Sequence, residues 1–174
     1  MASATAIEVR RLAVRDLSAI ETIERLSYRT PWSRSMFAGE LAKPSSVCLG
    51  GYDADTGLLV GYAIVSRYVD AWHVMNVAVD PEHRRHGIAT AMLARLFEVT
   101  RDDAERGYTL EVRVSNLAAI ALYESFGFVS RGVRRGYYTD NREDAVIMWR
   151  DPDPTPTGDS TSQPEPAANV EDEA

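Results

Sequence analysis

The chain has 174 residues, enough for one domain with a substantial core, and its 45% hydrophobic and 26% charged content is ordinary for a soluble globular protein. Cys48 is the single cysteine, which excludes an intrachain disulfide and argues against a cysteine-based metal site. Seven of the 26 acidic residues lie in 151–174, and the other 19 balance the 19 Lys and Arg, so the net charge of −7 belongs to the C-terminal end.

The N-terminal part is predicted to hold one strand and two helices. Residues 1–5 lack the features of a secretory signal, and no stretch approaches the roughly 18 apolar residues of a membrane span, so we expect a cytoplasmic protein. Ile7–Ala13 alternates apolar and charged side chains as a strand does. Asp16 is placed to cap a helix whose apolar positions are Leu17, Ile20, Ile23 and Leu26. Ser33 is placed to cap a second helix with apolar positions Met36, Phe37 and Leu41.

The middle of the chain favours three strands and a long helix. Val47–Tyr52 and Leu58–Arg67 are strand candidates joined by a turn rich in Asp and Gly. Ala71–Val79 is apolar on both faces, as expected of a central strand. Gly87–Arg106 predicts a helix about 30 Å long, with a buried stripe formed by Ile88, Met92, Leu96 and Val99.

The C-terminal part is predicted to complete the sheet. Tyr108–Val114 has a strand pattern, Asn116 can cap a helix that runs to Phe126, and two closing strands follow at Val129–Arg134 and Asp144–Arg150. Five of the eight prolines fall after Arg150, where large apolar side chains are almost absent. We therefore predict a folded domain over 1–150 and a disordered, acidic, proline-rich tail over 151–174.

The segment Arg84–Ala89 (RRHGIA) joins the central strand to the long helix. A helix N-terminus offers unpaired N–H groups and a positive dipole end, which attract phosphate oxygens, and Gly87 lets a ligand approach the backbone. The alternative is a solvated basic turn that caps a core helix. No GKS or GKT follows, so this is not a P-loop, and one glycine does not make a dinucleotide fingerprint.

A second group of polar residues follows the long helix. Asn116 and Tyr123 are seven residues apart, which places them on one helix face, and Glu111 lies on the strand that precedes them. Taken singly, Glu111 reads as a solvent-facing strand residue and Tyr123 as a core aromatic. Their combination with the basic turn indicates a site.

The order of these motifs resembles the GNAT family of acetyl-coenzyme A-dependent N-acetyltransferases. The resemblance rests on NVAVDP (76–81), RRHGIA (84–89), LEVRVSN (110–116) and ALYESFGF (121–128), and it covers roughly Ile7 to Arg150. Within the family the chain is most similar to the RimI-type enzymes, which acetylate the N-terminal alanine of a small-subunit ribosomal protein. That similarity adds Pro31-Trp32-Ser33 and Arg134-Arg135-Gly136-Tyr137-Tyr138.

The resemblance implies an α/β (α+β) fold: a mixed, mostly antiparallel central sheet, splayed between its fourth and fifth strands and flanked by helices. It also implies a coenzyme site. The pantothenate arm would pair with Val77, Ala78 and Val79, and Asn116 would be a further contact. The pyrophosphate would rest beside Arg84 on the backbone of Arg85, His86, Gly87, Ile88, Ala89 and Thr90.

The resemblance implies catalytic roles for Glu111 as general base and Tyr123 as general acid. An α-amine with a pKa of about 7.7–8.0 must lose a proton before it attacks, and a carboxylate can take that proton. The two walls of a peptide groove would be formed by Tyr28, Pro31 and Trp32 and by Tyr137 and Tyr138. The alternative for Tyr137 and Tyr138 is packing at a strand end.

We therefore expect acetyl transfer from acetyl-CoA to a protein N-terminus, as on the alanine of a ribosomal protein, by direct attack in a ternary complex. A GNAT enzyme acting on a lysine side chain or a small amine is one alternative, and a weakly active acetyl-CoA-binding subunit is another. No metal is expected, because His73, His83 and His86 lack partners at ligand spacing. Cys48 is expected to be a buried small apolar residue. The less favoured alternative is a ping-pong route through an acetyl-cysteine. We expect no direct contact with nucleic acid or membrane.

Overall fold

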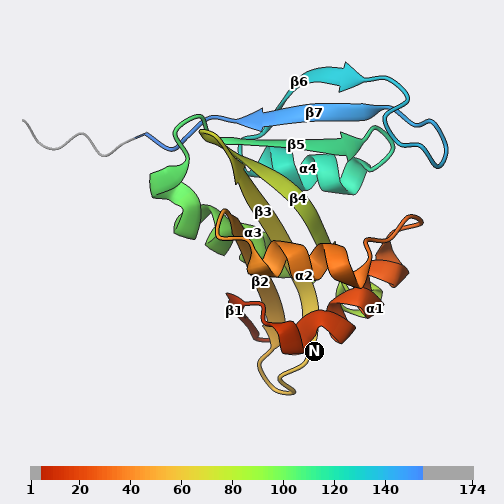
Figure 1. Cartoon of the computed structure of the whole chain (residues 1–174), viewed down its shortest axis with the longest axis vertical. Helices are drawn as coiled ribbons and strands as arrows, with labels where there is room; N and C mark the ends of the chain where they lie inside the picture. The colour runs from red at the N-terminus through yellow and green to blue at the C-terminus, as the bar shows by residue number, and fades with distance from the viewer. Residues whose placement is uncertain (1–4, 155–174) are drawn as a thin grey trace, which may run out of the picture.

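The computed structural model describes residues 5–154, which form a seven-stranded sheet with helices on both faces (Figure 1). The strand order is β1-β2-β3-β4-β5-β7-β6. The strands are β1 (Ile7–Arg11), β2 (Ser46–Asp53), β3 (Leu59–Tyr68), β4 (Ala71–Val79), β5 (Tyr108–Arg113), β6 (Val129–Arg134) and β7 (Ala145–Arg150).

The sheet opens between β4 and β5. Every other neighbouring pair is antiparallel, whereas β4 and β5 run parallel and share only two residue pairs, Trp72 with Tyr108 and His73 with Thr109. Beyond His73 the two strands separate, and Figure 1 shows β5, β7 and β6 turning away from β2, β3 and β4. The predicted mixed sheet, splayed between its fourth and fifth strands, is confirmed.

Two hydrophobic cores cover the two faces of the sheet. Helices α1 (Leu17–Ser27) and α2 (Arg34–Ala42) pack on one face, where the core includes Ile20, Phe37, Tyr62 and Ile64. Helices α3 (Ile88–Thr100) and α4 (Leu117–Ser125) pack on the other, where the core includes Met92, Leu96, Tyr108 and Tyr123. The open end of the sheet therefore lies between helices from both faces, namely α1 and α4.

The predicted helix Gly87–Arg106 is too long. Helix α3 ends at Thr100, about 20 Å from its start, and a single 3-10 turn follows over Arg101–Asp103. The Thr100 hydroxyl lies 2.8 Å from the Leu96 carbonyl and 2.8 Å from the Tyr108 hydroxyl, so the chain is already turning toward β5 there. Val99 is 38% exposed, and Leu93 and Phe97 take its predicted place in the buried face.

Three predicted helix caps and one predicted apolar position can also be checked. Ser33 accepts a hydrogen bond from the Met36 N–H and Asn116 accepts one from the Ala119 N–H, so both predicted caps are confirmed. Asp16 does not cap α1, because its carboxylate accepts from the Ala13 N–H at 2.8 Å and from the Tyr52 hydroxyl at 2.9 Å. Leu26, the last of the apolar positions named for this helix, is 60% exposed, so it does not share the burial of Leu17, Ile20 and Ile23.

The start of the predicted tail packs on the domain. Asp153 accepts a hydrogen bond from Arg150 at 2.7 Å and forms an ion pair with Arg101 at 3.4 Å. The rest of the predicted tail, 155–174, lies outside the described residues.

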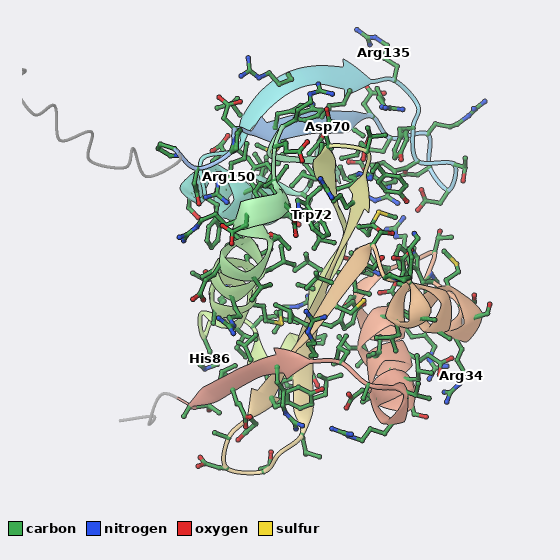
Figure 2. All side chains as sticks on the ribbon, turned by 60° about the vertical axis from the view of Figure 1, so that its left-hand side comes forward. Arg34, Asp70, Trp72, His86, Arg135 and Arg150 are labelled. Atoms are coloured by element: carbon green, nitrogen blue, oxygen red, sulfur yellow. The ribbon has the colours of Figure 1, made fainter. Side chains whose placement is uncertain are left out.

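The hairpin between β3 and β4 has a strained tip. Val69 has a φ of 58° and is 92% exposed, next to Asp70 (Figure 2). A left-handed backbone costs a β-branched residue roughly 1–2 kcal/mol that glycine avoids. We expect Val69→Gly to raise the free energy of unfolding by about 1 kcal/mol in urea denaturation. Val14, also exposed but without a positive φ, is the control: Val14→Gly should lower stability, and a loss in both variants would contradict the strain.

Candidate active site

Two neighbouring grooves open at the splayed end of the sheet. The large groove, of about 830 Å³, lies between the α1–α2 segment and the β6–β7 loop. The small groove, of about 470 Å³, lies between the end of β4, the turn before α3, and α4. Ser27 and Asn116 line both grooves, so the two adjoin at this point.

The small groove gathers almost all residues predicted to contact a coenzyme. Within the described chain, His86 is the one predicted contact that does not line it: its ring Nδ1 lies 3.1 Å from the His83 carbonyl, at the N-terminal end of α3 (Figure 2). The predicted contacts that do line it are Val77, Ala78, Val79, Arg84, Arg85, Gly87, Ile88, Ala89, Thr90 and Asn116.

The turn before α3 has the backbone of an anion-binding site. Arg85 and Gly87 both have left-handed φ values, 65° and 74°, and left-handed residues in a turn are typical of the backbone nests that bind anions. No atom lies within 4 Å of where a Cβ on Gly87 would stand, so the backbone there is open to a ligand. Arg84 holds this turn in place, because its guanidinium donates to the Val79 carbonyl at 3.0 Å and to the Ser27 hydroxyl at 3.2 Å.

The large groove has two aromatic walls. Tyr28 and Trp32 line one side and Tyr137 and Tyr138 the other. Pro31 lies in the same segment as Tyr28 and Trp32 but does not line the groove in the described part of the chain. The rest of the wall includes Glu24, Met75, Asn76, Arg113 and Asp140.

Arg113 at the end of β5 holds the β6–β7 loop. Its guanidinium donates to both carboxylate oxygens of Asp140 at 3.0 Å and to Glu143 at 3.3 Å, and it lies 3.9 Å from the centre of the Tyr138 ring. Hydrogen bonds from the hydroxyl and backbone N–H of Ser115 lower the pKa of Glu143 to about 2. This charged network therefore persists at neutral pH and places Tyr138 on the wall.

Glu24 is a buried carboxylate that the sequence analysis did not single out. It is 1% exposed and accepts hydrogen bonds from the Trp32 N–H and the Asn76 amide, both at 3.0 Å, and from the Tyr62 hydroxyl. It thereby fixes the groove segment after α1 to the central strands. Its position four residues after Ile20, on the buried face of an amphipathic helix, was the available signal.

Glu111 lies on β5, just past the point where β4 departs. Its carboxylate oxygens face two basic side chains. Oε2 accepts a hydrogen bond from His73 Nε2 at 2.6 Å, and Oε1 lies 3.7 Å from the Arg134 guanidinium. The hydrogen bond from His73, helped by the charges of His73 and Arg134, lowers the pKa of Glu111 against the effect of burial. In the described chain Glu111 lines neither groove.

Tyr123 is the buried residue of α4 and lines the small groove. Burial raises its pKa above the ordinary value near 10, and the nearby Tyr138 adds to the effect. Its phenol therefore remains protonated across the neutral range and can act as a hydrogen-bond donor.

Comparison with known proteins decides the family. The model of the acetyltransferase (GNAT) family matches residues 14–128. The chain belongs to the GNAT family.

Similar members of the family act on protein N-termini. The chain is 38% identical over 142 residues to the ribosomal protein bS18-alanine N-acetyltransferase of Escherichia coli (strain K12), covering 80% of this chain and 94% of that one. It is 38% identical over 125 residues to the N-alpha-acetyltransferase RimI of Mycobacterium tuberculosis, covering 70% and 76% of the two chains. The crystal structure of the E. coli S18-alanine enzyme matches with a TM-score of 0.74 and 36% identity, covering 82% of this chain and 92% of that one.

In this GNAT domain the two grooves are linked by Tyr28 at the end of α1. Its phenol donates to the Val77 carbonyl at 2.5 Å, so the wall of the large groove is tied to the strand that lines the small one. Burial raises the pKa of Tyr28, and the Tyr123 and Glu24 side chains raise it further. Tyr28 thus stays protonated. Two backbone acceptors assigned to the pantothenate arm already have donors: the Val77 carbonyl accepts from Tyr28 and the Val79 carbonyl from Arg84.

The other reactive groups of the GNAT domain lie apart from these grooves. Cys48 is buried, and burial raises the pKa of its thiol to about 12, so little thiolate forms at neutral pH. Among residues 5–154 no cluster of three or more His, Cys, Asp or Glu could hold a metal ion. No helix in the same range is long and apolar enough to cross a membrane.

Proposed function

We propose that this protein transfers the acetyl group of acetyl-CoA to the N-terminal α-amine of a protein, and that its substrate is the N-terminal alanine of a small-subunit ribosomal protein. The observation that carries the proposal is the pair of adjoining grooves, which share Ser27 and Asn116 in their walls. One groove suits an anionic, extended cosubstrate and the other a peptide end. The names of the E. coli and M. tuberculosis relatives support the same reaction.

The small groove fits acetyl-CoA on three counts. The turn at Arg85–Gly87 offers backbone N–H groups and the positive end of α3 to the pyrophosphate. The edge of β4 at Val77–Val79 has no strand partner on its β5 side, so an extended arm can lie along it. Tyr123, at the far side of the groove, can then face the thioester.

The reaction requires removal of one proton before attack. A peptide α-amine with a pKa of about 7.7–8.0 is largely protonated at neutral pH. Glu111 lines neither groove in the described chain, so in the proposed mechanism Glu111 takes this proton through an intervening water. The free amine nitrogen then attacks the thioester carbonyl carbon, the C–S bond breaks, and the coenzyme leaves as a thiolate. The nitrogen gives up its second proton to solvent to form the neutral amide, and the thiolate takes up a proton.

The raised pKa of Tyr123 changes how this residue serves that step. If the coenzyme thiol resembles cysteine, with a pKa of about 8.5, complete proton transfer from a phenol of ordinary pKa is already uphill by roughly 2 kcal/mol. Burial makes the transfer more unfavourable. In the proposal, Tyr123 stabilises the developing negative charge by donating a hydrogen bond, and solvent supplies the final proton.

The reaction proceeds in a ternary complex without an acetyl-cysteine. Cys48 lines neither groove among the described residues, and its raised pKa disfavours the nucleophilic thiolate.

The location in the cytoplasm and the domain boundary near Arg150 stay predictions of the sequence.

Thiol release from acetyl-CoA, measured with three related peptides, tests the proposal. The first peptide has a free N-terminal alanine and an internal lysine. The second has the same sequence with a blocked N-terminus, and the third has a free N-terminal alanine with the lysine replaced. We expect turnover with the first and third peptides and none with the second. Equal turnover with the first two peptides would indicate a side-chain amine instead. Turnover with none of them, despite acetyl-CoA binding, would favour a binding subunit.

A further inference from the structure

The contact between His73 and Glu111 bridges the opening of the sheet. His73 forms the last residue pair between β4 and β5, and Glu111 lies two residues after its partner Thr109. The 2.6 Å hydrogen bond between their side chains therefore spans the two strands where they begin to separate. No part of the coenzyme or peptide groove described above includes His73.

The bond orients the carboxylate. A carboxylate only accepts hydrogen bonds, so the His73 Nε2 atom carries a proton and donates it. Both side chains are largely shielded, with 26% of the imidazole and 13% of the Glu111 side chain exposed, so solvent competes weakly for this bond. The other carboxylate oxygen faces Arg134, whose side chain is 56% exposed and which is thus the looser of the two partners.

We propose that His73 is a positioning residue for the acetyl-transfer reaction, which fixes the orientation of the Glu111 carboxylate at the opening between β4 and β5. The inference rests on the proposed function, in which Glu111 is the general base. It adds a residue to which the family resemblance assigns no role.

The charged surroundings of the pair set the expected direction of the effect. The groups that face it are Arg134 on β6, Tyr68 on β3, whose ring centre lies 6.2 Å from that of His73, and Tyr138 in the β6–β7 loop, whose pKa Glu111 helps to raise. Of these, only Arg134 is a permanent cation. Removing His73 takes away the hydrogen bond that lowers the pKa of Glu111 most and leaves burial, which raises it. The pKa of Glu111 should therefore rise.

Steady-state kinetics on four variants test this, with His73→Phe filling the space without a donor and His73→Gln restoring a donor without a charge. We expect His73→Phe to lower kcat about tenfold, with the KM for acetyl-CoA unchanged. His73→Gln should recover most of that loss at neutral pH. Glu111→Gln should lower kcat at least as much as His73→Phe. Glu105→Gln, which breaks an exposed ion pair with Arg67, is the matched control and should behave as the parent.

A second readout separates positioning from a structural role. In ¹³C NMR titration of labelled carboxyl groups, assigned through the signal missing in Glu111→Gln, the pKa of Glu111 should rise in His73→Phe. A parental kcat and an unmoved Glu111 titration in both His73 variants, with Glu111→Gln impaired, would overturn the role of His73 alone. A parental kcat in Glu111→Gln would overturn the proposed base and His73 with it.

Discussion

Tyr123→Phe is expected to lower kcat by about 10²–10³-fold while the affinity for acetyl-CoA stays unchanged. The substitution removes one oxygen and keeps the ring, which packs against Phe128 at a centroid distance of 5.7 Å. What is lost is a hydrogen-bond donor on a side chain that is itself buried. Such a donor stabilises the charge that develops as the C–S bond breaks, and it contributes little before that moment.

The loss of kcat in Tyr123→Phe should not depend on pH, because Tyr123 is buried. The side chain is 9% exposed, and its pKa is raised, so the parent phenol is protonated over the whole neutral range. The kcat of the variant should therefore fall by the same factor at pH 6.5 and pH 8. Steady-state kinetics, with acetyl-CoA affinity from titration calorimetry, measure both quantities.

Tyr52→Phe is the matched control for this experiment. Tyr52 is also a buried tyrosine, 2% exposed, but its hydroxyl donates to Asp16 on the α1 side of the sheet and it lines neither groove among the described residues. Its loss should reduce stability by about 1 kcal/mol and leave kcat unchanged. An unchanged kcat in Tyr123→Phe, or an equal loss in both variants, would remove Tyr123 from the mechanism.

The elements of the fold were predictable because their signals are local. Alternation in Ile7–Arg11 and Tyr108–Arg113, and the caps at Ser33 and Asn116, depend on neighbours within a few residues. The end of α3 was not predictable in this way. Phe97 is buried because it packs against Tyr108 and Phe126, and helical spacing within α3 carries no information about those two residues.

The residues of the candidate site also differ in whether a local sequence pattern reveals them. The turn that we propose holds the pyrophosphate is one continuous segment, so its glycine and arginines stand out in the sequence. The contacts that position the reacting groups join residues far apart in the chain. Glu111 meets His73 across 38 residues, and Glu24 meets Asn76 across 52. Such pairs depend on the register of neighbouring strands and helices, and no local pattern in one sequence specifies it.

Gly107 is one residue through which fold and site depend on each other, and Gly107→Ala is expected to lower the free energy of unfolding by about 4 kcal/mol. Gly107 has a φ of 79°, and a Cβ there would lie 2.1 Å from the Arg150 carbonyl oxygen, a backbone atom that cannot rotate away. Gly57→Ala is the control for the backbone strain alone. Its φ is 73° with no atom within 4 Å of the new Cβ, so it should cost only about 1 kcal/mol.

Urea denaturation of both variants separates strain from the steric clash, and equal losses would show that β7 yields around Gly107. The clash has a consequence for the site as well. Gly107 immediately precedes β5, and its carbonyl accepts from the Trp72 N–H beside the two residue pairs that join β4 to β5. Any shift that relieves the clash moves this junction, and with it the spacing between His73 and Glu111. Gly107→Ala should therefore lose kcat at temperatures where it is still folded, whereas Gly57→Ala should keep it.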